Sequence, residues 1–207
     1  MIYSKSKPNY VLVENDVDSD NIDDSKSSNK DQSPLSNQLY FYSDVTRESI
    51  YLFNRQLSDL EKQLRYIQIN FELKDPPPIK LYISSEGGEV FSCFSAIDRI
   101  KNCKIPVDTY VEGIAASCAT LLSVVGRKRY MNRNSVMLIH SVSSGLWGNY
   151  QQFQDEKQNL DLIMKFIKNI YLNHTKFQEK ELDKLLKHDL YLSPEECIKF
   201  GLADYII

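Results

Sequence analysis

The chain has 207 residues, 42% hydrophobic and 26% charged, which is enough for one globular domain with a sizeable core. Its net charge of −3 excludes the strongly basic field that proteins use to bind nucleic acid. A basic run, Arg127-Lys128-Arg129, lies between apolar segments and is interpreted as a solvated turn. No apolar run approaches the roughly 20 residues that span a bilayer, and the N-terminus lacks a signal-peptide core.

The four cysteines contain no C-x-x-C pair and have no histidine at the spacing of a zinc site. We interpret them as free thiols in a reducing compartment. The cytoplasm is therefore the expected location, and an organelle stroma or matrix would be equivalent. No membrane partner is expected.

Residues 1–38 differ in composition from the rest of the chain. The stretch 14–31 is acidic, rich in Ser, Asn and Asp, and nearly devoid of large apolar side chains. Such a stretch cannot bury enough surface to offset its ordering entropy, so we predict a mobile acidic N-terminal arm. Alternating aspartates from Asp16 have the spacing of a calcium loop, but Asn21 and Ser27 stand where that loop needs Gly and Glu. A solvated arm is the better interpretation.

From Leu39 onward, apolar runs with strand character alternate with segments that have helical spacing of apolar residues. The predicted strands cover residues 39–42, 79–83, 105–111, 130–131, 135–139 and 204–207. The predicted helices cover residues 45–71, 89–100, 113–125, 149–173, 179–186 and 194–200. This repeated alternation predicts an α/β fold built on mostly parallel strands.

Three segments place reactive or flexible residues where a predicted strand meets a helix or loop. Gly87 and Gly88 directly follow an apolar strand, so backbone N–H groups there can point at an anion without interference from a Cβ. Ser117 lies just inside a predicted helix, where the helix N-terminus and the N–H of Cys118 can stabilise a developing oxyanion. His140 ends an apolar strand, where a buried imidazole needs a polar partner.

Each of these segments, taken alone, also has a structural explanation. A Gly-Gly pair commonly makes an ordinary turn, a helix of small residues can pack closely on a sheet around a tolerated serine, and a single strand-end histidine is usually structural. His174 and His188 are weaker candidates, because one follows a polar helix end and the other lies at a Lys-rich helix terminus.

Together the segments resemble the Clp protease proteolytic subunit, a serine peptidase family with a crotonase-like α/β superhelix of βαβ units. Five blocks match the family's motifs in order and spacing: Ser85-Glu-Gly-Gly88, Gly113-Ile-Ala-Ala-Ser117, Asn134-Ser-Val-Met-Leu-Ile-His140, Asp189-Leu-Tyr-Leu-Ser-Pro-Glu-Glu196 and Gly201-Leu-Ala-Asp204. The resemblance implies a peptidase domain over residues 39–207. It also implies a protruding handle, formed mainly by a long helix, at about residues 141–173.

The resemblance assigns a role to each matched residue. Ser117 would be the nucleophile, His140 the general base that then protonates the leaving amine, and Asp189 the group that orients the imidazole. Backbone N–H groups of Gly88 and Cys118 would form the oxyanion hole. Two other aspartates compete for the third role. Asp183 falls inside a predicted helix and Asp204 belongs to the closing motif, so Asp189 is preferred.

The resemblance also implies partners. Family members assemble into heptameric rings that stack into a tetradecamer, and a separate AAA+ unfoldase uses ATP to feed them unfolded proteins. No cofactor is expected in this chain, which has no G-x-x-x-x-G-K-[ST] motif for binding a nucleotide.

The sequence departs from the family pattern most in its acidic N-terminal region, which is longer than the family's pore-lining loop, and at three places within residues 39–207. Glu86 replaces the usual proline before the glycine pair and adds a negative charge beside the expected oxyanion hole. Ser141-Val142 replaces Gln-Pro after the histidine, and Lys80 replaces one of two tyrosines in the region where the family docks its unfoldase, while Tyr82 is retained.

These departures keep an alternative open: a catalytically weak or inactive structural subunit of a mixed ring. An acyl-CoA enzyme of the related crotonase type is disfavoured, because it gives the Ser, His and Asp set no role. A membrane-bound signal-peptide peptidase is disfavoured too, because neither a membrane segment nor a Ser/Lys pair is evident.

Overall fold

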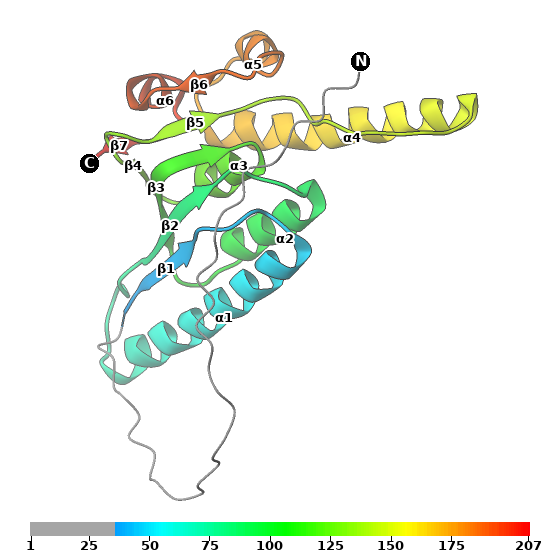
Figure 1. Ribbon diagram of the computed structural model, residues 1–207. Helices are drawn as coiled ribbons and strands as arrows, with labels where there is room; N and C mark the ends of the chain where they lie inside the picture. Colours follow the sequence, from blue (N-terminus) through cyan, green and yellow to red (C-terminus); the bar gives the residue numbers. More distant parts are fainter. Residues whose placement is uncertain (1–35) are drawn as a thin grey trace, which may run out of the picture. The chain divides into compact units, whose positions relative to one another are not determined.

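The computed structural model describes residues 36–207, so the predicted arm at residues 1–38 lies almost entirely outside the described residues. Strands and helices alternate through this part of the chain (Figure 1). The strands are β1 (Gln38–Phe41), β2 (Ile79–Ser85), β3 (Val107–Ala116), β4 (Arg129–Met131), β5 (Val136–Leu138), β6 (Tyr191–Leu192) and β7 (Tyr205–Ile206). The helices are α1 (Arg47–Asn70), α2 (Val90–Lys101), α3 (Cys118–Val124), α4 (Tyr150–His174), α5 (Glu179–Leu185) and α6 (Pro194–Phe200).

The strands form a sheet with a branch. Five of them pair in the order β1-β2-β3-β4-β7, and every pair is parallel. The last residues of β3, Ile114 to Ala116, pair with β5, which in turn pairs antiparallel with β6, while Ala115 also stays paired with Ser85 of β2 after a register shift. The long strand β3 therefore belongs both to the main row and to the branch.

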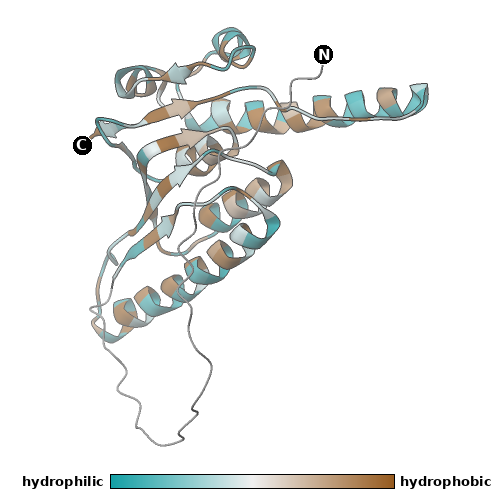
Figure 2. Cartoon of the chain, viewed as in Figure 1, coloured by the Kyte–Doolittle hydropathy of each residue, from teal (hydrophilic) through white to brown (hydrophobic). Residues whose placement is uncertain are grey.

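Helices α1 and α2 cover one face of the main row (Figure 1). Helix α1 begins where the Thr46 hydroxyl accepts a hydrogen bond from Ser49 N, and the Ser49 hydroxyl accepts one from Thr46 N in return. Its apolar side is buried against the sheet, whereas its other side is polar (Figure 2). The buried residues of this helix are Ile50, Phe53, Leu57, Leu60 and Leu64.

The opposite face of the main row carries a ladder of stacked tyrosines. In β2, the buried Leu81 and Ile83 alternate with Tyr82, which places Tyr82 on the face away from the helices. Parallel pairing in register aligns one tyrosine from each of the five strands, and their ring centroids lie 4.5–5.0 Å apart. The ladder consists of Tyr40, Tyr82, Tyr110, Tyr130 and Tyr205.

Two sequence predictions need correction. The predicted helix at 113–125 begins only at Cys118, because Ile114 to Ala116 are drawn into β3 by pairing with β5. The basic run is not a simple solvated turn, because Arg127 pairs with Asp108 at 2.7 Å and Arg129 pairs with Asp204 at 2.5 Å. Both arginines join the ends of strands that are adjacent only in the folded chain.

The predicted long helix is present as α4, which extends well beyond the sheet (Figure 1). It begins at Tyr150 after an extended segment, and Asn149 caps it by accepting a hydrogen bond from Gln152 N. Its buried residues, Ile167 and Tyr171, lie toward its C-terminal end. Helix α4 is thus attached to the rest of the fold mainly by its last turns.

Candidate active site

The branch of the sheet brings the three predicted catalytic side chains to one place. Ser117 directly follows β3, His140 lies two residues after β5, and Asp189 lies two residues before β6. These strands are neighbours, with Ala116 paired to Leu138 and Leu138 paired to Tyr191. Strand pairing therefore gathers segments that are far apart in the sequence.

Ser117 occupies a turn between β3 and α3 rather than a position inside the helix. Its φ of 52° and ψ of −125° are unusual for a residue that has a Cβ, and such a conformation costs about 1–3 kcal/mol. Hydrogen bonds hold it there: Ser117 N donates to Leu138 O at 2.8 Å, and Thr120 N donates to Ser117 O at 3.1 Å. These hydrogen bonds hold the sharp turn between β3 and α3.

Ser117 and His140 line the same cavity, which has a volume of about 210 Å³. Gly88 and Cys118 also line it, so the two groups expected to form an oxyanion hole share this space. The remaining wall combines polar side chains with apolar ones, the latter partly from α3 and from the C-terminal half of α4. These wall residues include Val90, Leu121, Val142, Ile167 and Tyr171.

The glycine loop packs directly against the Ser117 turn. Gly87 and Gly88 have φ values of +96° and +144°, which favour glycine, and a Cβ on Gly87 would lie 2.7 Å from the Ser117 Cβ. Val45 N donates to Gly87 O and Glu89 N donates to Val45 O, each at 2.7 Å. Within residues 36–207, no protein acceptor takes the N–H of Gly88 or of Cys118, so both can donate to a bound oxyanion.

Two thiols lie beneath this loop. The Cys118 thiol donates to Gly88 O at 3.3 Å, and the Cys93 thiol donates to Cys118 O at 3.2 Å. Hydrogen bonding with Cys93 lowers the pKa of the Cys118 thiol from its usual value, although burial opposes this shift. Both cysteines are free and buried, so their observed role is to connect α2, the glycine loop and the Ser117 turn.

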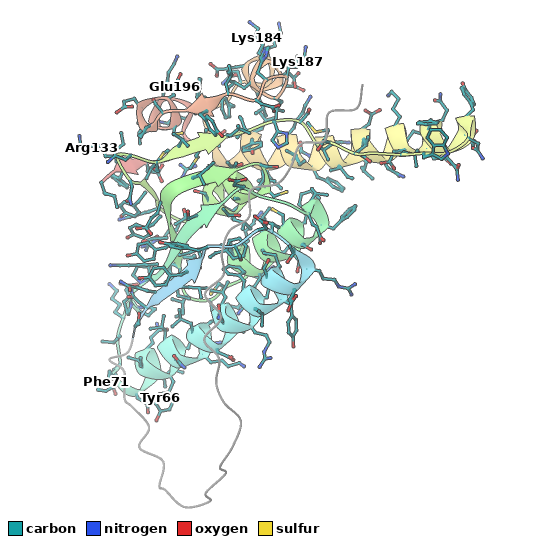
Figure 3. All side chains as sticks on the ribbon, in the orientation of Figure 1. Tyr66, Phe71, Arg133, Lys184, Lys187 and Glu196 are labelled. Atoms are coloured by element: carbon teal, nitrogen blue, oxygen red, sulfur yellow. The ribbon has the colours of Figure 1, made fainter. Side chains whose placement is uncertain are left out.

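The histidine and the aspartate are close without being hydrogen-bonded. His140 Nδ1 and Asp189 Oδ1 are 3.8 Å apart, and the Asp189 side chain is 81% exposed. In the described part of the chain, no hydrogen bond joins Ser117 to the His140 ring either. Asp189 follows the end of α5, where Lys184 and Lys187 point away from the sheet (Figure 3). The third group of the predicted triad thus lies on the exposed side of the site.

The two competing aspartates are engaged elsewhere. Asp183 Oδ1 pairs with Lys168 Nζ on α4 at 2.5 Å. Asp204 pairs with Arg129 through its side chain and also accepts a hydrogen bond from Arg129 N at 2.9 Å. Desolvation raises the pKa of Asp204, but the hydrogen bonds from Arg129 outweigh it, so the net pKa is below the usual value. Neither aspartate pairs with His140.

Sequence reasoning missed three residues around the cavity. Tyr171 of α4 lines it, and Thr120 connects Tyr171 to the Ser117 turn; their positions 51 residues apart conceal this contact. Glu89 also lines the cavity, whereas Glu86, which was expected to place a charge there, is exposed and is not part of its wall. At the start of α2 the Ser92 hydroxyl donates to Glu89 Oε2 at 2.8 Å, but no local sequence signal placed Glu89 at the cavity.

No helix among residues 36–207 is long and apolar enough to cross a membrane.

Comparisons with known proteins agree with this fold. The ATP-dependent Clp protease proteolytic subunit of Deinococcus radiodurans is 32% identical over 131 residues, which cover 62% of this chain and 64% of that relative, less than two thirds of its length. A solved structure of a ClpP1 mutant from Listeria monocytogenes matches with a TM-score of 0.70 at 22% identity, covering 83% of this chain and 91% of that one. The shared fold confirms the α/β superhelix expected from the sequence. The Clp protease family model matches residues 36–207. The chain therefore belongs to the Clp protease family.

Proposed function

We propose that this chain is the serine endopeptidase subunit of a Clp-type protease and that it cleaves unfolded proteins. The observation that carries the proposal is the cavity in which Ser117, held in a strained turn, faces the same space as His140 and the free N–H groups of Gly88 and Cys118. A simple turn serine has no need of this combination.

In the proposed reaction, Ser117 Oγ attacks the peptide carbonyl carbon while the His140 ring takes the hydroxyl proton. The carbonyl oxygen becomes an oxyanion that accepts hydrogen bonds from Gly88 N and Cys118 N, each worth about 3 kcal/mol in comparable sites. The C–N bond then breaks, and the amine leaves with the proton held by His140. Water repeats the sequence on the acyl-enzyme, which releases the acid and restores Ser117.

Asp189 is proposed to hold the His140 ring through Nδ1, which leaves Nε2 to face Ser117. The separation of 3.8 Å must shorten by about 1 Å for a charge-assisted hydrogen bond. A small movement of the segment between α5 and β6 is sufficient, and the exposure of Asp189 leaves that segment room to move.

The proposed assembly is a stack of two heptameric rings that encloses the active sites. Helix α4 has exposed apolar side chains available for contacts between copies, including Phe153, Leu162 and Phe166. A separate ATP-driven AAA+ unfoldase is the proposed partner that delivers unfolded chains. No cofactor is proposed for this chain.

The deciding experiment is labelling of the assembled protein with a fluorophosphonate probe. We expect a covalent adduct on the wild-type protein and none on Ser117→Ala. Ser95→Ala is the matched control, because Ser95 is an exposed serine on α2 outside the cavity, and it should label normally. Native mass measurement of the same samples tests the rings. Rings without a Ser117-dependent adduct would instead identify a structural subunit of a mixed ring.

A further inference from the structure

A buried pair of hydroxyl groups connects α4 to the backbone of Ser117. The Thr120 hydroxyl lies 2.6 Å from Ser117 O, to which it donates, and 2.5 Å from the Tyr171 hydroxyl. The side chain of Thr120 is fully buried, and that of Tyr171 is 2% exposed. Two hydroxyl groups and one carbonyl therefore form a continuous chain inside the protein.

The direction of the chain follows from counting protons. A threonine hydroxyl has a single proton, and Thr120 uses it to donate to Ser117 O, so the proton between Thr120 and Tyr171 belongs to Tyr171. Burial raises the pKa of Tyr171 above its usual value, which keeps this donor protonated. The order is Tyr171 O–H to Thr120 O–H to Ser117 C=O.

Ser117 requires such support because its backbone is strained. Its positive φ persists only where surrounding contacts outweigh a penalty of about 1–3 kcal/mol. The carbonyl of Ser117 accepts hydrogen bonds from both the amide and the hydroxyl of Thr120, so Thr120 restrains it twice. Tyr171 in turn orients the Thr120 hydroxyl, since donation into its oxygen leaves the threonine proton aimed at Ser117.

Tyr171 is itself held firmly at the end of α4. Its carbonyl accepts hydrogen bonds from Thr175 N at 2.9 Å and from the Thr175 hydroxyl at 2.6 Å. With Ile167, it forms the buried part of a helix whose other side chains are exposed or half-buried. A shift or rotation of α4 must therefore move the Tyr171 hydroxyl relative to Thr120.

We infer that Tyr171 and Thr120 are positioning residues that hold the backbone of the nucleophile and couple its alignment to the position of α4. This inference rests on the proposed peptidase function. Neither hydroxyl is assigned a proton transfer in the reaction, because each is already committed to its neighbour in the chain. Their effect on Ser117 acts through its carbonyl oxygen.

The kinetic test compares variants of the two residues in assembled protein, using a short fluorogenic peptide. Thr120→Val removes the donor to Ser117 and should lower kcat about 10²-fold, whereas Tyr171→Phe should lower it about 10-fold. KM should change less than about 2-fold, because the cavity wall keeps its shape. Thr120→Ser restores the hydroxyl and should recover most of kcat. The double variant should be no worse than Thr120→Val, because Tyr171 acts through Thr120.

Ser123→Ala supplies the matched control. Ser123 is another buried hydroxyl residue of α3, but its hydroxyl has no hydrogen-bond partner in the described structure. Its replacement should leave kcat and probe labelling unchanged. If Thr120→Val and Tyr171→Phe lower only the melting temperature, with kcat per folded site as in Ser123→Ala, the coupling does not exist.

A second measurement separates this inference from the proposed function. Amide hydrogen exchange is followed over residues 117–121 in the Ser117→Ala background, where no catalysis can occur. Adding Tyr171→Phe should speed exchange of the Thr120 amide several-fold, whereas adding Ser123→Ala should not. If the wild-type protein fails to label while the Ser117→Ala variants show this difference in exchange, the peptidase function is rejected and the coupling is kept. Equal exchange in both variants rejects the coupling.

Discussion

The segments that carry Ser117 and Asp189 are built in opposite ways. Ser117 lies in a turn whose backbone is restrained by Leu138 and Thr120 and against which the glycine loop packs closely. The Asp189 side chain is 81% exposed, and its Oδ1 lies 3.8 Å from Nδ1 of His140, the group it is proposed to orient. The proposed nucleophile and oxyanion donors are thus held in place within this chain, whereas the contact proposed to orient the His140 ring is not formed. Substitutions at the Ser117 segment should therefore lower activity more than substitutions at the Asp189 segment.

The largest effect is expected where the glycine loop meets Ser117. Gly87→Ala places a Cβ 2.7 Å from Ala116 O and from the Ser117 Cβ, in a backbone conformation that alanine rarely adopts. Because the proposed nucleophile and the proposed oxyanion donors must both shift, kcat/KM for a short peptide should fall about 10³-fold. Gly145→Ala is the control, since nothing lies within 4 Å of its Cβ position, and it should keep wild-type kinetics. Wild-type kinetics in Gly87→Ala would show that the turn is not restrained as described.

A smaller loss of activity is expected from substitution of Asp189, whose contact with His140 is not closed. Asp189→Asn should lower kcat about 10²-fold, less than the roughly 10⁴-fold that a buried triad aspartate can account for, because Asp189 is exposed and not yet hydrogen-bonded to His140. Asp183→Asn removes a carboxylate that pairs with Lys168 and should change kcat by less than about 3-fold. A larger loss in Asp183→Asn than in Asp189→Asn, measured by steady-state kinetics, would reassign the third group of the triad.

Asp204 offers a structural carboxylate for comparison with Asp189. Asp204→Asn should lower the free energy of unfolding by about 2 kcal/mol at neutral pH, because Arg129 loses its charged partner, while kcat per folded site stays unchanged. Denaturant titration measures the first quantity and peptide hydrolysis the second. A large fall in kcat with unchanged stability would place Asp204 in the chemistry instead.

The difference in stability between wild type and Asp204→Asn should depend on pH with a definite sign. The pKa of Asp204 is lowered in the folded chain, so the unfolded chain binds its proton more tightly. The stability it contributes is full above the unfolded pKa of about 4 and is lost as the pH falls through the lower folded pKa. Wild type and Asp204→Asn should therefore converge in stability below about pH 4. A gap that widens with acid would contradict the assigned ion pair.

The smallest effect is expected on the exposed side of α4. Lys157 and Asp161 form an ion pair at 2.6 Å, but their side chains are 71% and 66% exposed. Asp161→Asn should change the free energy of unfolding by less than about 0.5 kcal/mol, because solvent screens an exposed pair. Thermal melts of the two proteins check this value. It gives a reference value for an exposed ion pair, against which the partly exposed pair of His140 and Asp189 can be compared.

Much of the element order was predictable because its signals are local. The predicted helices at 45–71 and 194–200 are present as α1 and α6, and the features that bound them in the structure, the Thr46 and Ser193 caps and the left-handed Gly201, act within a few residues. The site residues were predicted from motif order, and the fold brings their segments together. The roles assigned to Ser117, His140 and Asp189 stay predictions until the labelling and kinetic experiments are done.

The sequence by itself determined the alternation of strands and helices, the family, and the candidates for chemistry, because these follow from local pattern and motif. Only the tertiary structure decided that Ser117 leaves the helix for a strained turn, since pairing with β5 draws the preceding residues into β3. It also decided that Tyr171 supports Thr120 and that Asp189 lies open to solvent. Contacts between distant segments depend on how strands pair and helices pack, and no local pattern records them.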